Sequence, residues 1–239
     1  MPPARAGKLP VADMPEHVRI DVTPSEHTTA IVYPAAKRDR AGIALILAHG
    51  AGSNQTSPFM VRLAGALAGR SIDVVTFNFL YSERRKRVPD RNDKLEACWR
   101  KVIDAFRDGA FGRHASPPFI GGRSMGGRIA SQVVAAGGVE IAGLVLLGYP
   151  LHPPGQPEKL RSKHLAAICV PMLIVQGSRD AFGTPDELRP FLDQLTVPIE
   201  LRVVAGGDHS YKVPKKLMAP EGVDKFVLDE VDRWLRGRV

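Results

Sequence analysis

A serine inside a glycine-rich segment is the residue of this sequence that points most directly to chemistry. Ser124 lies in GGRSMGG (121–127), which contains the pattern G-x-S-x-G. The flanking residues predict a strand before it and a helix after it, the context in which such a serine sits on a strained turn with its hydroxyl exposed. The turn also places the Met125 N–H at a helix N-terminus, where partial positive charge favours an oxyanion. Ser124 is therefore a candidate nucleophile, the alternative being a glycine-rich turn without chemistry.

A serine hydroxyl is a weak nucleophile and needs a base, which in turn needs an orienting group. Asp180 in QGSRD and His209 in GGDHS each directly follow a predicted apolar strand. In a parallel sheet these strand ends meet at the edge that carries Ser124, in the chain order Ser, Asp, His that such sites use. We predict that His209 accepts the serine proton and that Asp180 orients its imidazole. Asp208 is the alternative acid, but adjacent side chains seldom share the geometry that this role needs.

The tetrapeptide HGAG at residues 49–52 follows another predicted strand. An oxyanion hole needs a second backbone donor, and a loop of this type supplies one. Its glycines let the backbone approach a carbonyl oxygen closely. The N–H of Ala51 is our candidate, with Gly52 as the alternative. His49 either positions the loop or contacts a substrate.

Together these motifs resemble an α/β-hydrolase from about residue 18 to the end of the sequence. More narrowly, GGRSMGGR (121–128) and GYPLHPPG (148–155) resemble a group of small predicted hydrolases that includes testis-expressed and chromatin-complex hydrolase-like proteins. The resemblance implies that Ser124, Asp180 and His209 are nucleophile, acid and base, and that no cofactor is needed. The serine argues against the chemistry of dienelactone hydrolases, which use cysteine.

Several residues near these motifs have weaker claims to function. Arg123 could bind an acidic substrate group, although an ion pair that fixes the turn is our preferred interpretation. Tyr149 and His152 follow a predicted strand at the edge where ligands bind, and are candidate pocket residues. Arg128, one helical turn after the serine, is interpreted as a surface or supporting residue. The basic run Arg84–Arg87 could attract anions, but such runs are usually solvated loops.

The elements that must position these residues alternate along the chain. Apolar runs predict strands at 18–22, 28–33, 42–48, 73–79, 119–122, 141–147, 172–176 and 199–204. Amphipathic spacing predicts helices at 58–68, 94–106, 125–136, 186–195 and 223–235. This alternation predicts an α/β fold with a mostly parallel sheet and helices on both faces. The segment between the strands predicted at 141–147 and 172–176 holds only a loop and one short helix, so we expect no sizeable cap. We expect a flexible arm at 1–16 and a single domain at 17–239.

Composition narrows the function classes. The 239 residues are 44% hydrophobic and 24% charged, with a formal net charge of +8. The basic excess could reflect a polyanionic partner, an acidic substrate or solubility alone, and no nucleic-acid-binding module is recognisable. No apolar run reaches bilayer length, and the first residues lack the apolar core of a signal peptide. Cys98 and Cys169 have no disulfide or metal-site spacing, so we expect a reduced, cytoplasmic setting and no metal.

The sequence thus predicts a serine hydrolase that cleaves a small-molecule ester or thioester through an acyl-enzyme. Amide or peptide hydrolysis at the same site is one alternative. A catalytically weak protein that acts as a binding or scaffold module through its basic surface is the other. We expect no nucleic-acid or membrane partner, and the sequence leaves the oligomeric state open.

Overall fold

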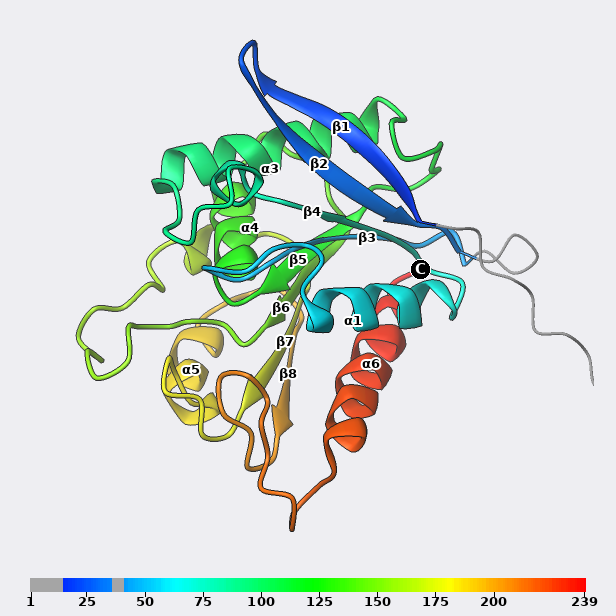
Figure 1. Ribbon diagram of the computed structural model, residues 1–239. Coiled ribbons are helices and arrows are strands. Elements are labelled where there is room, and N and C mark those ends of the chain that lie inside the picture. Colours follow the sequence, from blue (N-terminus) through cyan, green and yellow to red (C-terminus); the bar gives the residue numbers. More distant parts are fainter. Residues whose placement is uncertain (1–14, 36–40) are drawn as a thin grey trace, which may run out of the picture.

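An eight-stranded sheet runs through the computed structural model, which describes residues 15–35 and 41–239 (Figure 1). The strands are β1 (Glu16–Thr23), β2 (Glu26–Tyr33), β3 (Ala44–Ala48), β4 (Asp73–Phe77), β5 (Phe119–Arg123), β6 (Gly143–Leu147), β7 (Met172–Gly177) and β8 (Ile199–Val204). The helices are α1 (Pro58–Ala68), α2 (Leu80–Glu83), α3 (Asn92–Arg107), α4 (Met125–Ala135), the 3₁₀ turn η1 (Leu165–Ala167), α5 (Pro185–Leu192) and α6 (Pro220–Arg236). Most of the predicted 1–16 arm lies outside the described residues, and Glu16 already belongs to β1.

The sheet is mostly parallel, as predicted. Its strand order is β1-β2-β4-β3-β5-β6-β7-β8. Neighbouring strands in the part of the sheet β4-β3-β5-β6-β7-β8 are all parallel. In contrast, β2 is antiparallel to both of its neighbours, β1 and β4. The hairpin is antiparallel because the turn from Thr23 to Glu26 is too short for a parallel crossover. It extends one edge of the sheet (Figure 1).

Helices cover both faces of the sheet and enclose two hydrophobic cores. One core lies beneath α1 and α6, and the other beneath α3, α4 and α5 (Figure 1). In β3, Leu45 and Leu47 enter the first core, while Ala44, Ile46 and Ala48 enter the second. A strand buried on both faces must be apolar at every position, which is why β3 is a solid apolar run in the sequence.

Several boundaries differ from the predictions by a few residues; α5, for example, ends at Leu192 instead of residue 195. Two of the differences have clear physical reasons. The strand predicted at 73–79 ends at Phe77, because Phe79 is the N-cap of α2, whose single turn is too short to show helical periodicity. Helix α6 begins at Pro220, three residues before the predicted start, since proline fits the first turn of a helix.

The connection between β6 and β7 is a loop with only the short η1, so the expected absence of a large cap is confirmed. Within the described ranges, every helix is too short or too polar to cross a bilayer.

Candidate active site

The predicted site residues gather where the strand order changes direction. β3 is followed along the chain by β4 on one side of it and by β5 on the other. In open α/β sheets, ligands bind in the crevice outside the carboxyl ends of strands at such a switch point. His49 follows β3 and Ser124 follows β5, so both lie at this edge of the sheet.

Ser124 occupies a strained turn between β5 and α4. Its backbone has φ 49° and ψ −116°, a positive φ that non-glycine residues rarely adopt. The turn presses against the end of β3: a Cβ atom would lie 2.2 Å from Ala48 O if added to Gly122, and 2.4 Å if added to Gly126. Glycine is therefore required on both sides of Ser124, as the G-x-S-x-G pattern predicts.

A chain of hydrogen bonds connects Ser124 to Asp180. The Oγ of Ser124 lies 2.8 Å from Nε2 of His209. The Nδ1 of His209 lies 2.9 Å from Oδ1 and 2.8 Å from Oδ2 of Asp180. The side chain of His209 is 20% exposed, whereas that of Asp180 is 0% exposed. The geometry fits a hydroxyl that donates to a neutral imidazole, whose other nitrogen donates to a buried carboxylate.

Two residues without a clear sequence signal hold the hydrogen-bonded Asp180 and His209 in place. Gln176, at the end of β7, places Nε2 2.9 Å from Oδ2 of Asp180. The N–H of Phe182 donates to Oδ1 of Asp180 at 2.8 Å, and its ring stacks on that of His209 with 4.0 Å between centroids. The only sequence signal for Gln176 is an amide within an otherwise apolar strand, and Phe182 gives none. Both carboxylate oxygens are thus satisfied despite burial.

Asp208, the alternative acid, is engaged elsewhere. Its Oδ1 accepts the backbone N–H groups of Ser210 and Lys212, at 2.8 and 2.9 Å. The carboxylate therefore stabilises its own turn, and the side chain that reaches His209 is Asp180.

The loop 49–52 lies against the serine turn. A Cβ atom added to Gly50 would lie 3.6 Å from Ser124 Cβ, so the loop and the serine turn are in contact. Ala51 and Gly52, the two candidate oxyanion donors, are both exposed. His49 is fully buried: its Nδ1 lies 2.8 Å from Gly50 O, and its Nε2 accepts the N–H of Phe79 at 3.2 Å. Burial lowers the pKa of His49 to about 4, so it is neutral near pH 7. These contacts fix the loop and leave His49 no access to a substrate.

Arg123 does not form the ion pair that we preferred, at least not with any residue that the structure describes. Its Nη1 donates to Leu147 O at 2.8 Å, and its guanidinium lies 4.5 Å from the centre of the Tyr211 ring. Tyr211 lies two residues after His209 and donates its hydroxyl to a carbonyl oxygen of β7. A neutral backbone and an aromatic face replace the carboxylate, and they link the serine turn to the His209 loop.

Tyr149 and His152 are buried, at 1% and 5% exposed. The Tyr149 hydroxyl donates to Arg161 O at 2.6 Å, and the His152 Nδ1 lies 2.9 Å from Pro153 O. The backbone N–H of His152 donates to Phe182 O at 3.0 Å. These bonds brace the β6–β7 loop against the segment that contacts His209.

The basic run lies beside the HGAG loop. All four residues of the run are exposed, and Arg84 forms ion pairs with Glu26 and Asp90. A Cβ atom added to Gly52 would lie 3.6 Å from Arg87 O. The basic run is therefore solvated, and its backbone at Arg87 lies against the HGAG loop.

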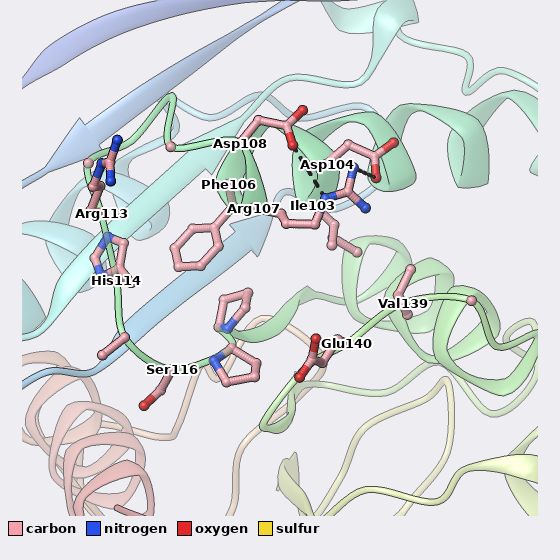
Figure 2. Close-up of a pocket in the computed structure, with 16 residues that line it drawn as sticks. Ile103, Asp104, Phe106, Arg107, Asp108, Arg113, His114, Ser116, Val139 and Glu140 are labelled. Atoms are coloured by element: carbon pink, nitrogen blue, oxygen red, sulfur yellow. Dashed lines mark hydrogen bonds and ion pairs between the residues drawn. The ribbon is translucent and has the colours of Figure 1, made fainter.

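A cavity of about 840 Å³ lies away from these residues, between the end of α3 and the segment that precedes β5. Figure 2 shows the residues that line it. Figure 2 shows Arg107 between Asp104 and Asp108, with N–O distances of 3.1 and 3.3 Å. The ring of His114 stacks on Phe106. Both aspartates pair with the single guanidinium of Arg107. No hydrogen bond joins a nucleophile to a base among the residues of this cavity, so we do not place the reaction there.

Other chemistry has less support in the described residues. Burial raises the pKa of the Cys98 thiol to about 12, which makes it a poor nucleophile. In the described part of the chain, no group of three or more His, Cys, Asp or Glu side chains could hold a metal ion.

Comparisons with known proteins agree with this architecture. The family model described as "Alpha/beta hydrolase domain" matches residues 41–225. Dienelactone hydrolase from Anabaena variabilis is 17% identical, with a TM-score of 0.73 over 95% of this chain and 98% of that one. Est1E from Butyrivibrio proteoclasticus is 16% identical, with a TM-score of 0.68 over 90% and 98%. An α/β serine hydrolase without a lid from Xanthomonas campestris is 19% identical, with a TM-score of 0.68 over 93% and 95%. The chain belongs to the α/β-hydrolase family.

Proposed function

We propose that this protein is a serine hydrolase that cleaves a small-molecule ester or thioester through an acyl-enzyme on Ser124. The observation that carries the proposal is the chain of short contacts from Ser124 Oγ through His209 to the buried carboxylate of Asp180. Three groups from separate loops meet in the order that activates a hydroxyl. The glycine-flanked, strained turn at Ser124 supports the same assignment.

In the first half of the reaction, Ser124 Oγ attacks the substrate carbonyl while its proton passes to Nε2 of His209. Asp180 accepts the Nδ1–H and stabilises the imidazolium that forms. The carbonyl oxygen becomes an oxyanion, which the N–H of Met125 stabilises at the start of α4. The N–H of Ala51 is the proposed second donor, with Gly52 as the alternative. His209 then gives its proton to the leaving alcohol or thiol, and the acyl group remains on the serine.

In the second half, water attacks the acyl-enzyme. His209 takes a proton from the water, the acid product leaves, and Ser124 regains its hydrogen from His209. The sum is one ester and one water converted to an acid and an alcohol or thiol, with no cofactor consumed. The small β6–β7 connection favours an open site suited to small or flexible substrates.

The narrower resemblance to testis-expressed and chromatin-complex hydrolase-like proteins is also a proposal. It is supported by GGRSMGGR at 121–128 and GYPLHPPG at 148–155. Under this assignment Arg123, Tyr149 and His152 act by positioning the serine and histidine loops rather than by touching the substrate.

The test is hydrolysis of a series of p-nitrophenyl esters of increasing acyl length by the native protein and by Ser124→Ala. A matched control is Ser116→Ala, which removes a hydroxyl at the distant cavity. We expect saturable turnover that Ser124→Ala abolishes and Ser116→Ala keeps. Turnover of aminoacyl amides in preference to every ester would favour the amidase alternative. No turnover of any substrate by folded protein would favour the binding or scaffold alternative.

A further inference from the structure

A basic cavity of about 530 Å³ lies outside the Ser124–His209–Asp180 chain, between the start of α3, the exposed side of α4 and the loop before η1. Arg128, Arg161 and Lys163 line it together with His164 and Asn92. No carboxylate is among its lining residues. A concave surface with three cations and no acid has a strongly positive local potential.

The charge of Arg128 has no carboxylate partner in the described part of the chain. Its Nη1 donates to Gln132 Oε1 at 3.1 Å and its Nη2 to Asn92 Oδ1 at 3.4 Å, both neutral amide oxygens. Its Nε is buried without a hydrogen-bond partner. By contrast, Arg70 contacts two carboxylates, those of Asp229 and Asp232. A partly buried guanidinium without a counter-charge is costly, so an anion would stabilise it.

Like charges lie near one another at this cavity. The pKa of Arg128 is lowered first by burial and next by the nearby charge of Arg161, while Tyr149 and Glu96 act in the opposite direction. The pKa of His164 falls to about 4, first through burial and then through Arg128. His164 therefore stays neutral near pH 7, with its Nε2 held 2.7 Å from Ser131 Oγ. Net positive charge comes from the two arginines and the lysine alone.

Two of the helices that line the cavity begin at the ligand-binding edge of the sheet. Helix α4 begins directly after Ser124, and Arg128 lies one turn into it. Helix α3 begins at Asn92, at the same edge, and packs beside α4 (Figure 1). Three cations exceed what a single carboxylate would neutralise, whereas a phosphate dianion with three acceptor oxygens can accept from all three.

We propose that this cavity binds the phosphate group of a small ligand, with Arg128, Arg161 and Lys163 as its counter-charges. The site is independent of the proposed hydrolysis, because none of its residues belongs to the hydrogen-bonded chain at Ser124. Free phosphate and a phosphate monoester share the recognised chemistry, and the planned measurement separates them.

The experiment is calorimetric titration of the native protein with inorganic phosphate and, separately, with phenyl phosphate, at neutral pH and constant ionic strength set with chloride. The informative variants are Arg128→Gln and Arg161→Gln. Arg161 has no side-chain hydrogen bond within the described residues, so its replacement should leave folding intact. The matched control is Arg113→Gln, an exposed arginine at the cavity of Figure 2.

We expect saturable binding that weakens about tenfold or more in each cavity variant, as loss of a charged hydrogen bond predicts, and that Arg113→Gln leaves unchanged. Tighter binding of phenyl phosphate would identify an organic phosphate as the ligand class, and tighter binding of inorganic phosphate would identify the free ion. The proposal is overturned if neither probe binds saturably, or if folded Arg161→Gln binds as tightly as the native protein.

Discussion

Replacing Arg123 with methionine should separate the histidine loop from the serine turn. The guanidinium donates to Leu147 O at 2.8 Å and lies 4.5 Å from the ring centre of Tyr211. A charged hydrogen bond contributes about 1.5–3 kcal/mol, and a partly desolvated cation–π contact about 0.5–2 kcal/mol. Methionine keeps most of the volume, and Leu147 O keeps its bond from the Ser124 N–H. The expected loss of unfolding free energy is therefore about 2–4 kcal/mol.

The effect on activity should exceed the effect of destabilisation alone. Because Tyr211 lies two residues after His209, a looser ring lets the imidazole move from Ser124 Oγ. We expect kcat to fall between about tenfold and about a hundredfold, with KM for neutral esters little changed. Urea unfolding and p-nitrophenyl acetate kinetics measure the two effects on the same samples.

Arg100→Met is the matched control. Arg100 also donates its guanidinium to backbone oxygens, those of Gly137 and Val133, but at the far end of α4. It should lose stability and keep kcat. If Arg123→Met keeps both stability and kcat, or loses no more kcat than Arg100→Met, the bridging role is wrong. A KM increase confined to acidic esters would instead make Arg123 a substrate contact.

Three further predictions test other parts of the site. Asp180→Asn should lower kcat by roughly 10³- to 10⁴-fold with KM nearly unchanged, because the amide favours the wrong imidazole tautomer; an activity near native would exclude Asp180 as the orienting acid. Gly126→Ala should destabilise the fold by at least about 3 kcal/mol, because the new Cβ would lie 2.4 Å from Ala48 O. Gly65→Ala, which has open space around it in α1, should stabilise the fold by up to about 1 kcal/mol. Urea unfolding that ranks the two variants the other way would contradict this packing. The pKa of His49 is about 4 in the folded protein, against 6.5 for the free side chain. Below pH 6.5 the unfolded state therefore binds a proton that the folded state does not. The free energy of unfolding should fall by about 3 kcal/mol in total as the pH approaches 4. The His49→Gln variant should lose this part of the pH dependence, and an unchanged slope of unfolding free energy against pH would refute the buried neutral imidazole.

The sequence predicts most of the architecture because buried parallel strands and amphipathic helices leave periodic apolar patterns. Helix α1 and strand β8 have the predicted bounds. The pairing of Ser124 with His209 and Asp180 follows from chain order and from the rule that parallel strand ends share an edge. Their mutual geometry is a local consequence of the fold, which is why three residues far apart in the sequence could be assigned together.

Contacts that depend on side-chain direction were not predictable. The acceptors of Arg123 are a carbonyl oxygen and an aromatic ring, neither of which a sequence pattern can distinguish from a carboxylate partner. Gln176 and Phe182 support Asp180 through loop packing that has no periodic signature. Tyr149 lies at the expected sheet edge, but its hydroxyl turns toward its own loop. Position at the edge was predictable, and orientation was not.

The most direct measurement of the central claim is covalent labelling of the folded protein with a fluorophosphonate, read by intact mass and by mapping of the modified peptide. Ser124 Oγ lies 2.8 Å from His209 Nε2, so it should be the activated nucleophile. We predict a single adduct on Ser124 that is lost in Ser124→Ala and strongly slowed in Asp180→Asn. Absence of an adduct on folded native protein, or undiminished labelling of Ser124→Ala, would contradict the assignment of Ser124 as the nucleophile.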